Sequence, residues 1–135
     1  MPERHDHEHG DISPELMWSG TPEGTQELVL LVDDPDAPMP GSFIHWVLVG
    51  LSPSRTGLGE AEIAEEATSG ANGFGTPGYL GPAPPPGHGT HHYVFRLLAL
   101  REPISVPELA TYTSVEEACS GKVIAEARLT GTFER

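Results

Sequence analysis

Glycine and proline limit what this chain can fold into more than any other feature of its sequence. It has 16 Gly and 14 Pro among 135 residues, and six of these Gly and five of these Pro lie between positions 71 and 90. Both are unfavourable inside helices, because Gly costs backbone entropy and Pro removes a hydrogen-bond donor. The sequence therefore argues against a bundle of long helices and favours a domain of strands and loops.

Three apolar runs predict strands in the middle of the chain. Glu27–Asp33 and Ser42–Leu51 are short runs rich in aliphatic, β-branched and aromatic residues, as expected for buried strands. Thr90–Leu100 is a third run, and strand alternation places His91 and Tyr93 on the same face. The fold class that follows is mainly β.

The last third of the chain predicts one helix and a final strand. Good helix formers favour a helix over Val115–Ala127, divided or capped by Gly121, and a strand over Arg128–Phe133. Residues 52–70 begin with turn residues and become acidic, which indicates an exposed loop with one turn of helix at most. We therefore expect a single domain over residues 1–135, with a peripheral helix near the C-terminus.

The charge balance excludes several classes of partner. Seven basic residues against 20 acidic ones give a formal net charge of −13. Proteins that bind nucleic acid or anionic membranes need a basic patch to contact phosphates, so we predict no nucleic-acid partner and no stable membrane association. No apolar stretch has the length of a membrane span, and no segment near the start resembles a signal peptide. We expect a soluble, cytoplasmic protein.

Residues 71–90 predict a functional loop. A loop of this length is uncommon in a compact domain unless it is functional or a linker. A flexible linker is the alternative, but Phe74 and Tyr79 within the segment favour an ordered binding loop. The pattern GxGxxG at 73–78 neither follows a buried strand nor begins a helix, so it does not predict a dinucleotide site.

Two further sets of reactive side chains carry weaker signals. His5, His7 and His9 would share one face of an extended segment, and such a face can bind Zn²⁺ or Ni²⁺. A solvated N-terminal segment is the interpretation we favour, so we predict no metal and no other cofactor. Cys119 has no basic neighbour before Lys122, which indicates an inert thiol rather than a nucleophile.

The strongest candidate site combines Asp34, His45, His91 and Tyr93. Each lies within, or at the end of, a predicted strand, beside loops rich in Gly and Pro. A lone His in an apolar strand is usually a hydrogen-bonded core residue. Two of them with an Asp favour a small anion pocket instead, because imidazoles can donate to an anion and a carboxylate can fix their tautomers. Nearby glycines let backbone N–H groups approach such a ligand closely.

Four motifs in order carry a resemblance to a known family. They are Asp34–Pro38 (DPDAP), Phe43–Trp46 (FIHW), Gly81–Gly87 (GPAPPPG) and His91–Phe95 (HHYVF). Together they resemble the phosphatidylethanolamine-binding protein family, in particular its bacterial and archaeal Raf-kinase-inhibitor-like branch. The resemblance implies an antiparallel β-sandwich-like fold with a peripheral helix near the C-terminus.

The resemblance also implies a surface pocket for phosphate, phosphorylethanolamine-like headgroups or similar anions. The residues matched to this pocket are Asp34, Pro38, His45, Gly81, Ala83, His91 and Tyr93. Gly81 and Ala83 would contribute backbone groups, and Pro38 would shape the wall after a cis peptide bond, which X–Pro sequences adopt at low cost.

Some features depart from the family pattern. His92 stands where the family has Arg, and because it lies on the opposite strand face from His91 we expect a structural contact there. The cysteines common in the family near His7 and at Ala83 are absent. The chain looks short of the family's N-terminal strand region before Pro2–Arg4, which would expose a sheet edge or require a partner.

The leading functional prediction is a non-enzymatic binding protein for a small anionic or phosphorylated ligand. One alternative is a regulatory interaction module that inhibits a protease or a kinase. Another is a weak hydrolase that uses the His and Asp residues as acid and base, although it would lack a positioned nucleophile. A homodimer is a further possibility that the sequence leaves open.

Overall fold

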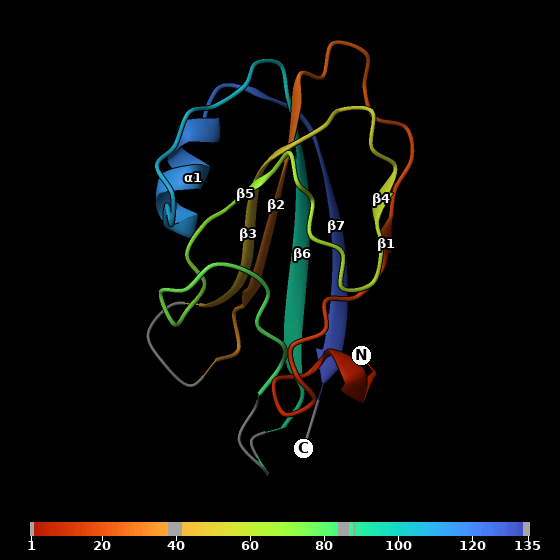
Figure 1. Cartoon of the computed structure of the whole chain (residues 1–135), viewed down its shortest axis with the longest axis vertical. Coiled ribbons are helices and arrows are strands. Elements are labelled where there is room, and N and C mark those ends of the chain that lie inside the picture. The colour runs from red at the N-terminus through yellow and green to blue at the C-terminus, as the bar shows by residue number, and fades with distance from the viewer. Residues whose placement is uncertain (1, 38–41, 84–86, 88, 134–135) are drawn as a thin grey trace.

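The long apolar runs of the sequence form the strands at the centre of the molecule (Figure 1). The computed structural model describes residues 2–37, 42–83, 87 and 89–133. Its elements are η1 (Glu3–His5), β1 (Leu16–Met17), β2 (Glu27–Asp34), β3 (Phe43–Leu51), β4 (Gly57–Leu58), β5 (Thr68–Ser69), β6 (His91–Leu100), α1 (Tyr112–Cys119) and β7 (Val123–Phe133).

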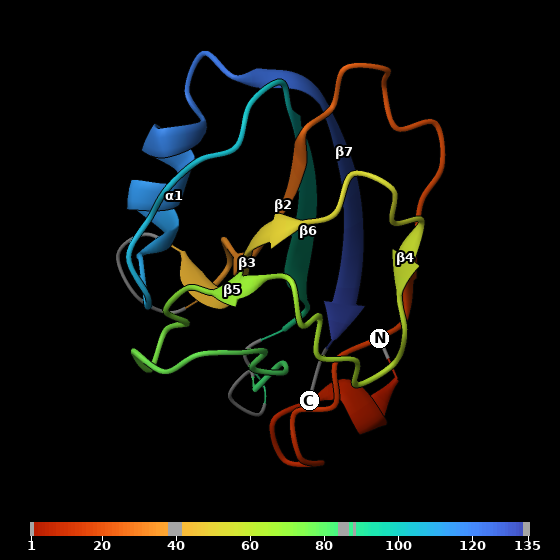
Figure 2. The same ribbon diagram turned by 45° about the horizontal axis from the view of Figure 1, so that its top comes forward.

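Most strands belong to one antiparallel sheet with the order β5-β3-β2-β6-β7. Strand β2 pairs with β3 on one side and with β6 on the other, and β7 pairs with β6 along its whole length. Strands β1 and β4 form a separate two-stranded sheet, which lies beside the large sheet on the side away from α1 (Figures 1 and 2). Within the described ranges, no helix has the length and hydropathy of a membrane-spanning helix.

Strand β2 is apolar along most of its length because both of its faces are buried. Leu28, Leu30 and Val32 point into a cluster that the β1–β4 side covers, with Leu58, Trp46, Tyr93 and Phe95. Val29 and Leu31 point into a second cluster, which contains Val115 and Cys119 of α1. A strand covered on both faces loses the alternation of polar and apolar residues, as the sequence of β2 does.

The mainly-β antiparallel fold, the single domain and the helix near the C-terminus are confirmed. The predicted extent of the helix is wrong, because α1 ends at Cys119 and residues 123–127 belong to β7. Thr111 caps the start of α1 by accepting a hydrogen bond from Ser114 N (3.1 Å). After the helix, Gly121 adopts a φ of +79°, which suits Gly and ends helical geometry. Residues 52–70 form the expected loop, interrupted by the short strands β4 and β5.

Replacing Leu31 tests how much the second cluster contributes to stability. Leu31 is 0% exposed, so Leu31→Ala leaves a cavity against α1 and should lower the unfolding free energy by about 2–5 kcal/mol. Ile63 is 87% exposed, and Ile63→Ala should change it by less than about 0.5 kcal/mol. Urea denaturation followed by circular dichroism measures both. Equal losses of unfolding free energy in the two variants would show that Leu31 does not contribute to the core as described.

Candidate functional site

A buried hydrogen bond between two side chains joins the end of β2 to the start of β6. Asp34 is the last residue of β2 and His91 the first of β6, and antiparallel pairing brings these two ends together. Nδ1 of His91 donates to Oδ2 of Asp34 at 2.7 Å, and both side chains are almost completely buried. Oδ1 of Asp34 accepts from the backbone N–H of Asp36 at 2.8 Å, which fixes the carboxylate. The pair therefore sets the orientation of the His91 ring.

His45 on β3 is also fixed through its Nδ1 atom, but its partner is a backbone carbonyl. Its Nδ1 donates to the oxygen of Leu80 at 2.6 Å, and Leu80 N–H donates back to His45 O at 2.8 Å. Burial lowers the pKa of His45, so the ring is neutral near pH 7. Because the proton lies on Nδ1, Nε2 is a bare acceptor. No described residue hydrogen-bonds to that atom.

Tyr93 lies between the two imidazoles. Its ring packs edge-on against His45, with centroids 5.1 Å apart, and is nearly parallel to His91 at 6.5 Å. The structure thus brings together Asp34, His45, His91 and Tyr93 from three adjacent strands. All four are buried, and they lie at the end of the sheet where β6 begins.

The other predicted pocket residues lie on the loop between β5 and β6 or beyond the described ranges. Gly81 is buried and Ala83 is exposed. The backbone N–H of Gly81, which was expected to serve a ligand, donates to Oδ1 of Asp11 at 2.9 Å. Pro38 and the peptide bond before it lie outside the described residues.

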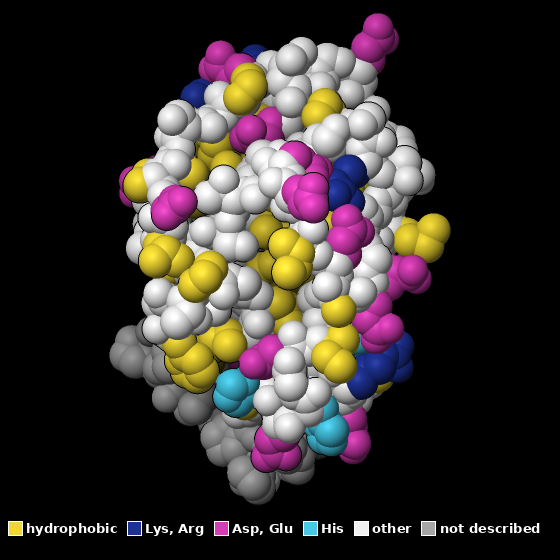
Figure 3. Space-filling model, in the orientation of Figure 1, with side chains coloured by type: hydrophobic (Ala, Val, Ile, Leu, Met, Phe, Trp, Pro, Cys, Tyr) yellow, Lys and Arg dark blue, Asp and Glu magenta, His cyan; other side chains and the backbone are white. Residues whose placement is uncertain are grey.

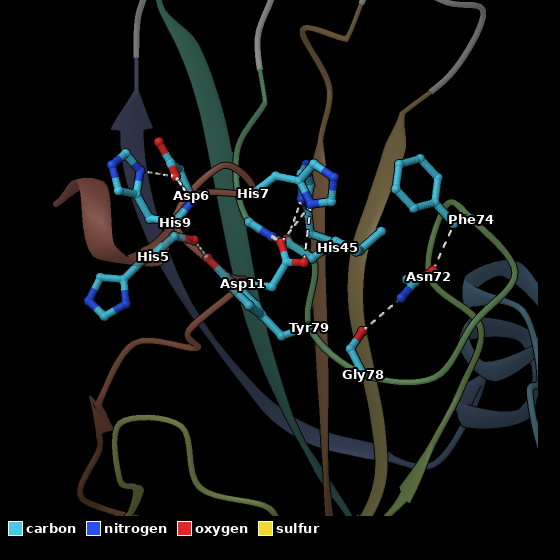
Figure 4. Close-up of polar contacts among 12 residues, drawn as sticks. His5, Asp6, His7, His9, Asp11, His45, Asn72, Phe74, Gly78 and Tyr79 are labelled. Carbon is cyan, nitrogen blue, oxygen red and sulfur yellow. Dashed lines mark hydrogen bonds and ion pairs between the residues drawn. The ribbon is translucent and has the colours of Figure 1, made fainter.

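Asn72 gives the first part of this loop a defined shape. Its side-chain oxygen accepts from Phe74 N, Thr76 N and Thr76 Oγ1, and its Nδ2 donates to Gly78 O at 3.1 Å. Figure 4 shows the bonds to Phe74 and Gly78. Asn72 is buried, so these bonds are shielded from water. The expectation of an ordered segment is therefore confirmed for residues 72–78.

The N-terminal segment packs over the same loop, which the sequence did not predict. His7 N–H donates to Pro82 O at 3.0 Å, and the Tyr79 hydroxyl donates to His5 O at 2.7 Å. His5 and Asp6 are 3% and 2% exposed, so the expectation of a solvated segment is wrong for these two residues. Figure 3 shows imidazole and carboxylate side chains close together at this end of the molecule.

The three N-terminal histidines bond to three different acceptors. His5 donates to Ile12 O, His7 to the Asp11 carboxylate and His9 to Asp6 Oδ1. Figure 4 shows the bonds of His7 and His9. The hydrogen bond that His9 donates to Asp6 raises the pKa of His9. In the part of the chain that the structure describes, no three metal-ligating side chains form a group that could hold an ion.

His7 connects the N-terminal segment to the site through aromatic contacts. Its Nδ1 lies 2.9 and 3.1 Å from the two oxygens of Asp11, and its ring packs edge-on against Phe74 at 5.7 Å. Phe74 contacts Phe43, which in turn contacts His45 at 5.1 Å. A continuous series of rings therefore leads from the partly exposed His7 to the buried imidazole of His45.

Two residues outside the cluster behave as the sequence predicted. The backbone N–H and Nδ1 of His92 both bond to Asp36, at 2.8 and 2.7 Å, and these bonds lower the pKa of Asp36. His92 thus makes a structural contact. Burial raises the pKa of the Cys119 thiol to about 11, so it stays protonated and unreactive near neutral pH.

Comparison with known proteins identifies the family. The family described as phosphatidylethanolamine-binding protein matches residues 1–134. A UPF0098 protein of Aquifex aeolicus is 42% identical over 130 residues, which cover 93% of this chain and 75% of that protein. A Mycobacterium tuberculosis protein with the lipoprotein name LppC is 40% identical over 124 residues, 92% of this chain and 61% of that protein.

A solved structure supports the same conclusion. The crystal structure of the phosphatidylethanolamine-binding protein homologue CT736 from Chlamydia trachomatis matches with a TM-score of 0.92 at 37% identity, and the match covers 99% of this chain and 88% of that one. This chain therefore belongs to the phosphatidylethanolamine-binding protein family.

Gly81→Ala tests the docking of the N-terminal segment. A Cβ at Gly81 would overlap the carbonyl oxygen of His5 and the backbone of Asp6, so the segment must move away. Hydrogen exchange at residues 5–11 should become faster, and the unfolding free energy should fall by about 1–3 kcal/mol. Gly59→Ala is the control, because its Cβ would meet Glu62 Oε1 at an ordinary 3.5 Å. Unchanged exchange in Gly81→Ala would contradict the docking.

The lowered pKa of His45 makes stability depend on pH. The unfolded chain takes up a proton at His45 near its ordinary pKa of 6.5, whereas the folded chain does so only at lower pH. Stability should therefore be complete above pH 6.5 and fall as pH decreases, with a slope of at most about 1.4 kcal/mol per unit from this group. Urea denaturation at several pH values should give a flatter profile for His45→Gln than for the wild type. Ile63→Ala, which changes an exposed side chain that does not titrate, should keep the wild-type profile between pH 7 and 5.5.

Proposed function

We propose that this chain is a non-enzymatic binding protein whose cluster of Asp34, His45, His91 and Tyr93 binds the phosphoryl group of a small, soluble ligand. The observation that carries the proposal is that both imidazoles are held by Nδ1, His91 by a buried carboxylate at 2.7 Å and His45 by a carbonyl at 2.6 Å. In such an arrangement the protein fixes the orientation of each ring through Nδ1, and at His45 it leaves Nε2 to accept a hydrogen bond from a ligand. Membership of the family supports a binding role.

The protonation of His45 limits which anions fit. Neutral His45 presents an unprotonated nitrogen, which accepts a hydrogen bond from an O–H or N–H group of a ligand but repels a fully ionised oxygen. A phosphate monoanion carries an O–H group, and phosphoethanolamine also carries an ammonium group, so both can donate to it. An anion without a proton needs His45 to become charged first. We therefore expect a preference for ligands that bring their own proton.

The net charge of the chain works against anions, so local contacts must supply the affinity. At −13, the protein repels anions at long range. A site that binds its ligand with only a few imidazole, hydroxyl and backbone groups is expected to have a dissociation constant in the range of roughly micromolar to millimolar. Small soluble headgroups suit this site better than an anionic bilayer surface. The cytoplasmic location expected from the sequence stays a prediction, since one relative carries a lipoprotein name.

Titration with phosphate, phosphoethanolamine and sulfate at pH 7 tests the proposal. Histidine side-chain NMR should show that phosphate and phosphoethanolamine shift the signals of His45 and His91. Sulfate carries no proton at this pH and should bind more weakly. His91→Gln should weaken phosphate binding at least about tenfold, because hydrogen bonds to charged groups contribute roughly 1.5–3 kcal/mol.

His92→Gln provides the matched control for the titration. His92 is the next residue of β6, is exposed and bonds to Asp36 rather than to the cluster. The variant should bind phosphate within about twofold of the wild type, since a surface contact of this kind contributes little. If saturating phosphate leaves the signals of both His45 and His91 unmoved, the assignment of the site is wrong.

A further inference from the structure

A second hollow, separate from the proposed phosphoryl site, lies over β3. Its volume is about 330 Å³, which is within the range of small-molecule sites. Its lining combines side chains of β3, residues 61–64 and 77–79 of the two loops that flank β5, and part of the N-terminal segment. None of the four residues of the phosphoryl-binding cluster lines it. The hollow therefore needs an explanation of its own.

The bottom of this hollow is apolar and aromatic. Trp46 and Leu48 of β3 line it and are 4% and 6% exposed. The ring of Trp46 packs edge-on against that of Tyr79, with the ring centroids 5.3 Å apart. Ile63 lines the hollow as well, although it is 87% exposed. A large exposed apolar side chain beside an aromatic cavity is suited to cover an apolar ligand.

Two carboxylates line the same hollow, and none of its described lining residues is basic. One of them, Glu62, accepts from Gly59 N–H at 2.7 Å and pairs with Arg55 at 2.8 Å. These bonds lower the pKa of Glu62, so it is ionised near pH 7. Its side chain is still 35% exposed, and a carboxylate has about four acceptor positions. Glu62 can therefore accept a further hydrogen bond from a ligand.

The N-terminal segment supplies the second carboxylate and a hydroxyl. Asp11 accepts from His7 Nδ1 and from Gly81 N–H, at 2.9 Å each, and its side chain is 26% exposed. Ser13 is 6% exposed, and no described residue hydrogen-bonds to its hydroxyl. Because a buried hydroxyl normally has a hydrogen-bond partner, a donor in the hollow would satisfy it.

The walls of the hollow are joined to each other. The backbone N–H of Ala61 donates to Ser13 O at 3.0 Å, which connects the loop after β4 to the N-terminal segment. Asp11 and Ala61 have φ angles of +56° and +59°, which non-Gly residues seldom adopt unless the surrounding structure holds them. The cavity is thus formed by the fold before any ligand arrives.

We propose that this hollow binds a small aromatic amine in its ammonium form. The aromatic ring would pack on Trp46 and be covered by Ile63. An ammonium group has three N–H donors and no acceptor, which matches a lining with two carboxylates and one buried hydroxyl. The net charge of −13, which repels anions, attracts such a cation at long range. An anion of the same shape would instead meet two like charges.

Calorimetric titration with three probes of similar shape at pH 7 tests the chemistry of the site. Phenethylamine should bind at least about fivefold more tightly than 2-phenylethanol, which has a hydroxyl in place of the ammonium, because charge-assisted hydrogen bonds are stronger. The anion 3-phenylpropionate should bind most weakly. In NMR spectra, phenethylamine should shift the ring signals of Trp46 and Tyr79. The signals of Trp18, which does not line this hollow, should stay in place.

Three charge-neutralising variants of one loop separate direct contact from changes in the loop itself. Glu62→Gln should weaken phenethylamine binding at least about fivefold, since it removes a charged acceptor. Glu66→Gln also removes a carboxylate bonded to Arg55, but Glu66 does not line the hollow. Glu65→Gln changes an exposed residue that does not line it either. Both control variants should bind within about twofold of the wild type.

Ile63→Ala tests the apolar part of the site in a chain that should keep its stability. Loss of the covering side chain should weaken phenethylamine binding about threefold or more, because less apolar surface is buried. Saturating phosphate should leave the dissociation constant of phenethylamine within about twofold, since the two sites share no residue.

Other results would overturn the proposal. Equal affinities for the three probes, or unmoved signals of both Trp46 and Tyr79, would show that the hollow does not select an ammonium ion. If Glu66→Gln or Glu65→Gln weakens binding as much as Glu62→Gln does, Glu62 does not contact the ligand. Displacement of phenethylamine by phosphate would place the amine in the phosphoryl-binding cluster instead.

Discussion

The arrangement of the molecule depends on β2, which is paired on both edges and buried on both faces. Because its neighbours β3 and β6 run antiparallel to it, the end of β2 lies beside the start of both. Asp34 is therefore placed next to His91 on one side and near His45 on the other. The site is a consequence of where three central strands begin and end, so its side chains are attached to buried, paired strands of the sheet.

The two buried histidines have different chemistry because their Nδ1 partners differ. A carboxylate holds His91, whereas a carbonyl holds His45, and burial keeps the His45 ring neutral by lowering its pKa. One pair of imidazoles thus combines a ring next to a fixed negative charge with a ring that acts as an acceptor. Under the proposed function, this difference would favour ligands that carry both a negative charge and a proton. The residue types alone did not reveal it.

Local sequence patterns predicted the strands and the fold class but not the boundary between α1 and β7. Residues 123–127 contain good helix formers, yet they extend along β6 because pairing over the full strand outweighs intrinsic propensity. In the same way, the Gly/Pro-rich loop was expected to be ordered, but the sequence could not show that Asn72 holds it. Such contacts depend on which distant backbone groups are brought within hydrogen-bond reach.

The sequence by itself determined the central strands, the mainly-β fold and, through four motifs, the family and its candidate site residues. This was possible because buried strands and short motifs are defined by residues that are close together in the sequence. Only the tertiary structure decided that the N-terminal segment covers Gly81, that Asp11 bonds to its N–H and that His7 reaches Phe74. Gly81 and Asp11 are 70 positions apart in the sequence. Their contact depends on how the whole chain packs, so no local sequence pattern could predict it.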